Sequence, residues 1–295
     1  MPSDQPQKTY RRMKLVFGLV LLGVFYAEFT DRDYKPILTH HSAIVLAGPR
    51  VSEDPLDKLI RSHPLAAMIE LRDRHVHEVK DYGCSMVKQE LLPSGMSAEQ
   101  EMNVKFRQEP YSVMMHWVRN GGLANRVIYV KGRWTEQDAE SKDQRDLALC
   151  QPGAVAQMFL KSIKMPIHGS MAKRTARRSI DEFGFKRTLD LLIKYCEVAE
   201  SRGELRLEYR GETHFDGRPV WVIRRHLPYT EGSELYPDRT AEIFIDKEYR
   251  VPVAVYCYAD DAMEPAKLLG KYEYRNIRFN LDFTGSDFDP ATYGM

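Results

Sequence analysis

The chain has 295 residues, with 43 basic and 42 acidic side chains and a formal net charge of +1. This length allows one or two domains, and the balanced charge argues against nucleic-acid binding, which needs a clustered basic surface. The four cysteines are far apart in sequence and show no metal-ligand spacing: Cys84, Cys150, Cys196 and Cys257. In an exported chain they could pair in three ways. We expect instead that each is a small buried apolar side chain.

The N-terminus has the features of an export segment. Basic residues between Lys8 and Lys14 precede the uncharged apolar run Leu15–Ala27, and acidic residues follow from Glu28. A helix over this run spans about 20 Å, which is short for a bilayer core of about 30 Å and typical of a signal-peptide core. We therefore predict that residues 1–30 are a signal peptide or a retained signal-anchor. The rest of the chain is then periplasmic or in the cell envelope, with anchoring to the inner membrane as the alternative to cleavage.

Residues 31–54 contain turn-forming residues and little apolar periodicity, which predicts a linker. Pro64 suits the first position of a helix. Apolar residues follow it at helical spacing: Leu65, Met68, Ile69, Val76 and Val79.

From Tyr82 the apolar pattern changes to alternation. Four short strands are expected, over residues 85–92, 102–107, 113–117 and 127–130. Because parallel strands need long crossovers, this close spacing predicts an antiparallel meander.

The middle of the chain is expected to be helical, and its last part returns to strands. Ser179 and Glu182 have the spacing of a capping box, and Gly203 suits a helix end. Between them lies an apolar stripe at helical spacing: Leu189, Leu192, Ile193 and Cys196. Alternating strands follow, with Asp216-Gly217 as a hairpin turn. We therefore predict an α+β fold in which one curved antiparallel β-sheet is covered by a few α-helices.

The sequence contains no nucleophile elbow, zinc-protease motif, phosphate loop or Cys-x-x-Cys pair. We therefore expect no enzymatic activity, no catalytic residues, no bound metal and no cofactor. His75 and His77 are two residues apart, so on a helix they do not share a face, and we expect a solvated helix end. A basic cluster precedes Ser179: Lys173, Arg174, Arg177 and Arg178. Lipid phosphate could bind there, but a solvated basic face is favoured.

Some strands are apolar on both faces, as in Val113–Val118 and Trp221–Ile223. A sheet covered on one side normally shows polar residues on the other. Two-sided apolarity therefore implies either two covering layers or an apolar cavity that holds a ligand, and the sequence leaves both open. The candidates for lipid binding are aromatic or methionine side chains on strands: Met115, Trp117, Tyr129, Tyr209 and Trp221.

The segment Asp81–Tyr111 resembles the core of the DUF1571 proteins, an uncharacterised family of exported bacterial proteins. The matching positions are Tyr82, Lys88, Glu90, Val104, Lys105, Phe106, Arg107 and Pro110. The closing stretch Leu281–Met295 is similar to that family's terminal Asp-Phe-Asp-Pro-x-x-Tyr-Gly signature. Residues Ile243–Val253 resemble the hairpin of periplasmic lipoprotein-carrier proteins of the LolA-like superfamily.

This resemblance covers about residues 60–295. It implies an open half-barrel of antiparallel strands, closed by helices, whose concave side holds acyl chains or other apolar ligands. We therefore expect residues 55–295 to form a single LolA-like domain, with the polar stretch Trp134–Arg145 as a lid or a loop. The expected function is to hold a lipid or a lipidated partner, with the membrane as a further partner if residues 1–30 are retained. The alternative is a non-enzymatic structural or interaction protein of the envelope with a filled core.

Overall fold

The computed structural model describes residues 54–138, 143–153, 157, 159–232 and 234–295. All of them belong to one compact unit, Ala43–Met295. Residues 1–30 and the predicted linker, apart from Asp54, lie outside the described residues. Within the described part of the chain, no helix is both long and apolar enough to cross a membrane.

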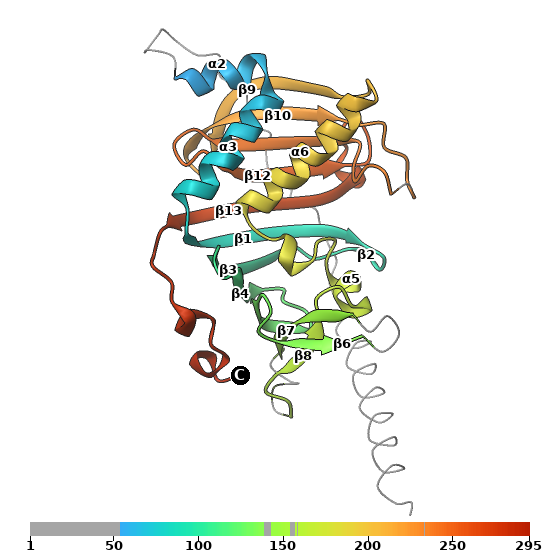
Figure 1. Cartoon of the computed structure of the whole chain (residues 1–295). Helices are drawn as coiled ribbons and strands as arrows, with labels where there is room; N and C mark the ends of the chain where they lie inside the picture. The colour runs from blue at the N-terminus through green and yellow to red at the C-terminus, as the bar shows by residue number, and fades with distance from the viewer. Residues whose placement is uncertain (1–53, 139–142, 154–156, 158, 233) are drawn as a thin grey trace, which may run out of the picture. The chain divides into compact units, whose positions relative to one another are not determined.

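The centre of the unit is an open antiparallel sheet of 13 strands, as predicted (Figure 1). The strand order is β6-β7-β5-β4-β3-β1-β13-β12-β11-β10-β9, with β2 paired to β1 and β8 paired to β7. The first strands are β1 (Asp81–Leu92), β2 (Gly95–Met96), β3 (Gln100–Arg107), β4 (Ser112–Arg119), β5 (Ala124–Val130), β6 (Thr135–Gln137), β7 (Gln144–Pro152) and β8 (Ile163–Pro166). The others are β9 (Arg206–Phe215), β10 (Arg218–His226), β11 (Thr240–Asp246), β12 (Pro252–Tyr258) and β13 (Leu268–Phe279).

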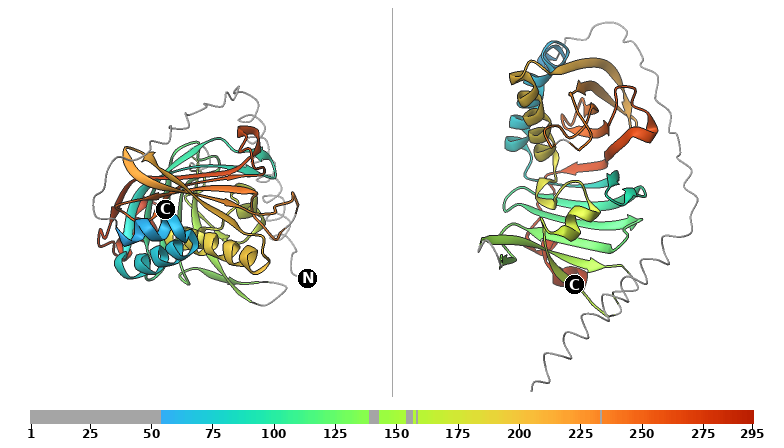
Figure 2. Two further views of the ribbon diagram at one scale, coloured as in Figure 1. Left: turned by 90° about the horizontal axis from the view of Figure 1, so that it is seen from above. Right: turned by 90° about the vertical axis from the view of Figure 1, so that its right-hand side faces the viewer.

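Three helices lie on one face of the half-sheet β9–β13 (Figure 2): α2 (Pro55–Ser62), α3 (Pro64–Glu78) and α6 (Phe185–Ser201). We call this the helix-side face. Local signals start these helices: the Asp54 carboxylate accepts a hydrogen bond from the Leu56 amide at 3.0 Å, and a proline opens both α2 and α3. The predicted capping box of Ser179 and Glu182 is present, but it starts the short 3-10 helix η1 (Ile180–Glu182) rather than α6 itself.

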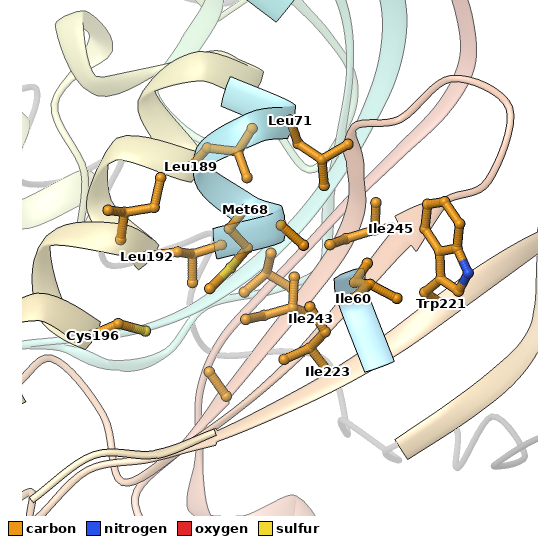
Figure 3. Close-up of a cluster of buried hydrophobic side chains, with 14 of the residues drawn as sticks. Ile60, Met68, Leu71, Leu189, Leu192, Cys196, Trp221, Ile223, Ile243 and Ile245 are labelled. Atoms are coloured by element: carbon orange, nitrogen blue, oxygen red, sulfur yellow. The ribbon is translucent and has the colours of Figure 1, made fainter. Parts of the chain in front are cut away.

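The helices bury their apolar stripes against the sheet in the main core (Figure 3). Met68 and Leu71 of α3 meet Leu189 and Leu192 of α6, and all four are at most 5% exposed. On the sheet side they pack on isoleucines of β10 and β11: Ile223, Ile243 and Ile245. The predicted stripes are therefore core packing. Helix α2 was not predicted as a helix, because it starts directly at the end of the expected linker.

The C-terminal tail covers the opposite face of the sheet at β4 and β5. It contains the 3-10 helices η3 (Gly285–Phe288) and η4 (Pro290–Tyr293), and Phe288 is fully buried against Met114 and Ile128. The Arg107 guanidinium lies 5.0 Å from the centre of the Phe288 ring, and Lys105 pairs with Asp287 at 2.8 Å. A second covering layer therefore explains why β4 is apolar on both faces.

The remaining short elements are α5 (Ser170–Thr175) and η2 (Pro265–Lys267). The polar stretch Trp134–Arg145 contains β6 and the start of β7, which pair as a hairpin. Residues 139–142 of that stretch lie outside the described residues.

All four cysteines are free thiols, as expected. Cys84, Cys196 and Cys257 are buried and Cys150 is half-buried. The expectation for His75 was wrong, because only 4% of this residue is exposed. Its ring lies 5.8 Å from that of Phe185 and 6.5 Å from that of Tyr82. Burial, together with the charge of Lys186, lowers the pKa of His75 to about 4.

Candidate binding surface

An apolar row crosses the helix-side face from β3 to β8. Val104, Met115, Val127, Cys150 and Ile163 lie directly opposite one another on successive strands. Directly paired residues share a face, and adjacent strands are about 4.8 Å apart, so the row is about 19 Å long. We call these five residues the apolar strip.

Exposure of the apolar strip rises toward the edge of the sheet. Val104 is 3% exposed and Val127 is 9% exposed, whereas Ile163 at the outer end is 46% exposed. Met115 and Cys150 are half-buried. The strip therefore begins in the core and ends as an open apolar surface.

Trp117 borders the apolar strip. It pairs with Met102, and its indole Nε1 donates a hydrogen bond to Gln100 Oε1 at 3.3 Å. A hollow of about 190 Å³ lies beside it, lined by the β4–β5 hairpin and Gly153. Pockets that enclose a drug-sized ligand usually measure about 300–1,000 Å³. The surface at Trp117 therefore offers contact along a strip rather than an enclosed cavity.

Tyr129 lies on the same face, but it is covered. Its hydroxyl donates a hydrogen bond to Asp146 at 2.6 Å, and its ring lies 5.8 Å from that of Tyr111. The Tyr111 hydroxyl holds the covering segment by hydrogen bonds to the carbonyl oxygens of Ile180 and Phe183. Burial raises the pKa of Tyr111. This part of the face is closed, and Tyr129 is only 2% exposed.

Tyr209 and Trp221 lie apart from the apolar strip, in the core under the helices. Trp221 is 1% exposed, and its indole donates a hydrogen bond to Asp57 of α2. Tyr209 packs against the same core, with the Arg61 guanidinium 5.8 Å from its ring centre. Trp221 thus packs under the helices, and Tyr209 is half-buried at the border of the same core.

A polar cluster lies on β1 and β13, four residues along β1 from Cys84, which pairs with Val104 at the inner end of the apolar strip. Lys88 on β1 lies opposite both Gln100 on β3 and Tyr272 on β13. Its ammonium group pairs with Glu90 at 2.8 Å, and the Tyr272 hydroxyl donates to the same carboxylate at 2.8 Å. Glu90 is only 2% exposed. Burial, followed by the negative charge of Glu90, raises the pKa of Tyr272.

A second hollow, of about 240 Å³, lies elsewhere, where β12 separates from β13. Its arginines are paired: Arg218 binds Asp246 and Glu248, and Arg275 binds Glu273 at 2.7 Å. The hollow is therefore polar, and the charges of both arginines are neutralised by carboxylates. Among the residues that the structure describes, no group of three or more His, Cys, Asp or Glu side chains could hold a metal ion.

The candidates predicted from the sequence include Met115 and Trp117 but not Cys150 and Ile163, which the strand pairing places in the same row as Met115. The strands β7 and β8 were not predicted, although Leu147–Cys150 is a short apolar run of the kind found in buried strands. The polar stretch before β7 obscured this signal.

The chain belongs to the DUF1571 family, described as proteins of unknown function, whose model matches residues 79–293. This confirms the family expected from the sequence. No curated protein matches the chain.

Several solved structures are similar in fold. The crystal structure of MucB is 11% identical with a TM-score of 0.45, and the alignment covers 77% of this chain and 63% of MucB, less than two thirds of its length. The Mycobacterium tuberculosis lipoprotein LppX is 12% identical with a TM-score of 0.37, over 77% of this chain and all 100% of LppX. A LolA superfamily protein from Nitrosomonas europaea is 8% identical with a TM-score of 0.25, over 76% of this chain and 97% of that one. These similarities concern the fold alone.

Proposed function

We propose that this protein is a non-enzymatic binding protein that holds an acyl chain, from a lipid or a lipidated partner, along the apolar strip. The observation that carries the proposal is the open outer part of the strip. Ile163 at the outer end is 46% exposed and Cys150 beside it is half-buried, while Met115 and Trp117 nearer the inner end are also half-buried. Fully burying an apolar side chain of this size is worth about 1.5–3 kcal/mol, and an acyl chain would supply part of that burial.

The second candidate function is an interaction protein of the envelope with a filled core. The tight packing of Trp221 and Tyr209 under α2, α3 and α6 favours it. The two functions differ in what the apolar strip does, because a filled scaffold does not bind an acyl chain there.

We further propose that residues 1–30 direct export or anchor the chain, that residues 31–54 link them to a single domain of residues 55–295, and that this domain works in the periplasm or envelope. The support is the basic flank and the short apolar run Leu15–Ala27. An export segment would bring the strip to a compartment that contains lipids and lipoproteins.

Contact quenching of tryptophan tests binding at the strip. The full chain in nonionic detergent is titrated with the methyl ester of a chain-brominated dodecanoic acid, since bromine quenches only tryptophans that it touches. The chain has three tryptophans, Trp117, Trp134 and Trp221. Only Trp117 borders the apolar strip, so we expect saturable quenching in wild type and none in Trp117→Phe.

Ile163→Lys and Leu281→Lys form a matched pair for the same titration. Ile163 is 46% exposed at the strip and Leu281 is 37% exposed away from it. Ile163→Lys should weaken binding by roughly tenfold, the equivalent of about 1.4 kcal/mol of lost apolar contact, while Leu281→Lys should match wild type. Absence of quenching, or equal quenching in both variants, would favour the filled scaffold.

A further inference from the structure

Large apolar side chains are exposed at the β8 edge of the sheet. Strand β8 pairs with β7 on one side, and within the described ranges no strand pairs with it on the other. Four large apolar residues on and around β8 are at least 41% exposed: Phe159, Leu160, Ile163 and Met171, with Phe159 at 78%. Because apolar groups gathered on a surface usually mark an interaction site, this edge is a candidate docking surface.

The same edge is basic. Residues 147–180 contain no acidic side chain, although the whole chain has 42 acidic against 43 basic residues. Six basic residues lie in this stretch: Lys161, Lys164, Lys173, Arg174, Arg177 and Arg178. The first four are exposed, and among the described residues none of these four forms an ion pair. The β8 edge therefore combines exposed apolar groups with positive charge that no carboxylate neutralises.

The chain brings these residues close together at β8 and α5. The Gly169 amide donates a hydrogen bond to the Pro166 carbonyl oxygen at 3.0 Å, and the Lys173 amide donates one to the Gly169 carbonyl oxygen at 3.1 Å. A tight turn thus joins β8 directly to α5, whose residues lie within roughly 15 Å of the end of the strand. We call the eight exposed residues the edge patch: Phe159, Leu160, Lys161, Ile163, Lys164, Met171, Lys173 and Arg174.

Arg177 and Arg178 do not belong to the edge patch. Both are half-buried, and the Arg177 guanidinium donates a hydrogen bond to the Pro237 carbonyl oxygen at 3.0 Å. The chain turns back toward the sheet here, since the Ser179 hydroxyl donates a hydrogen bond to the Ile167 carbonyl oxygen at 3.1 Å. The solvated basic face expected from the sequence is therefore wrong for these two arginines, whereas Lys173 and Arg174 are exposed as expected.

The chemistry of the edge patch favours a lipid bilayer as its occupant. Aromatic and aliphatic side chains interspersed with lysine and arginine are typical of interfacial segments. Their apolar groups enter the headgroup region while their cations attract anionic lipids. A partner chain that added a strand here would meet an unfavourable edge, because β8 has only four residues and contains Lys164 and Pro166. Lysine and proline on an edge strand disfavour pairing with another chain.

We propose that the edge patch docks on the surface of an anionic phospholipid bilayer, with Phe159 and Leu160 in the headgroup region. This inference goes beyond the proposed function, because docking requires no ligand on the apolar strip. Docking also places Ile163, the outer end of the strip, at the bilayer. An acyl chain that leaves the membrane would then enter the strip at its open end.

Quenching of an added tryptophan by brominated lipid tests the docking. The full chain is diluted from detergent onto preformed vesicles of phosphatidylcholine brominated in its acyl chains, with or without phosphatidylglycerol. We expect Phe159→Trp to gain quenching over wild type on the anionic vesicles and to gain none on the neutral ones. Leu281→Trp is the matched control, because Leu281 is 37% exposed in the tail that follows β13. It should gain no quenching on either kind of vesicle.

Charge reversal tests the basic part of the edge patch. Each basic residue near an anionic surface strengthens binding by about fivefold. Lys161→Glu with Lys164→Glu, in the Phe159→Trp background, should therefore lower the gain in quenching by at least about fivefold. Lys58→Glu with Lys80→Glu changes the net charge equally at two exposed sites, on α2 and before β1, and should keep the gain.

Several outcomes would overturn the docking: no gain for Phe159→Trp on anionic vesicles, equal gains on neutral and anionic vesicles, an equal gain for Leu281→Trp, or equal losses in the two charge-reversed variants. A response of the added tryptophan to polyglutamate but not to lipid would also overturn it, and would assign the edge patch to an acidic protein.

The methyl ester titration of Trp117 separates this inference from the proposed function. If the ester quenches Trp117 but the edge patch does not respond to vesicles, docking fails and the proposed function stands. If the edge patch docks but the ester does not bind, the proposed function fails and docking stands.

Discussion

Substitution of Phe288 tests whether the C-terminal tail is part of the hydrophobic core or can be released while the sheet stays folded. The side chain is fully buried against Met114 and Ile128, on the face of β4 and β5 opposite the helices. Truncating a buried Phe to Ala costs about 3–5 kcal/mol. Loss of the Arg107 contact with the ring adds roughly 0.5–1 kcal/mol. Against a total stability of about 5–15 kcal/mol, Phe288→Ala should shift the unfolding midpoint strongly.

The assay is equilibrium unfolding in urea, followed by circular dichroism, with Phe159→Ala as the control. Phe159 is 78% exposed, so its truncation should change the free energy of unfolding by less than about 0.5 kcal/mol. If Phe288→Ala lowers that free energy by less than about 1 kcal/mol, the tail does not complete the core. Limited proteolysis would then show whether the segment after β13 is released while the sheet remains folded.

Two further predictions concern buried charge. Burial lowers the pKa of His75 to about 4 in the folded chain, from an ordinary value of 6.5. Between these two pH values the unfolded chain therefore binds a proton at His75 and the folded chain does not. Stability should therefore fall as pH drops from about 6.5 toward 4, by up to about 3 kcal/mol. This loss should be reduced in His75→Leu but kept in a variant of the exposed His77, as measured by chemical unfolding at each pH. The Arg225 guanidinium binds both oxygens of Asp238 at 2.9 and 3.0 Å, and each side chain is 2% exposed. Arg225→Met should lower the free energy of unfolding by about 3–5 kcal/mol, because it leaves a buried carboxylate unpaired. Adding Asp238→Leu should recover most of that stability. A double variant no more stable than the single one would contradict this.

Much of the local structure follows from the sequence because its causes are local. The stripe from Leu189 to Cys196 predicts α6, since residues three and four apart share a helix face. Asp216-Gly217 predicts the β9–β10 turn, and both residues do have positive φ, at 51° and 76°. Alternation in residues 102–107 predicts β3 and the face that it buries.

The candidate site depends on pairings between distant segments, which local patterns do not determine. Tyr272 and Lys88 are directly paired although β1 and β13 lie at opposite ends of the domain sequence. The apolar strip acquires Cys150 and Ile163 only because β7 and β8 extend the sheet beyond β5.

The tertiary structure also decided which of the candidate binding residues are buried. Trp221 and Met115 both read as apolar strand residues, yet α2 covers the first and the second remains half-exposed. The two-sided apolarity of β4 could mean a cavity or a second layer, and docking of Phe288 supplied the layer. The sequence by itself determined the two long helices α3 and α6, most strands, the antiparallel class and the family. Only the tertiary structure decided which apolar faces stay open, because that depends on which distant segments dock on them.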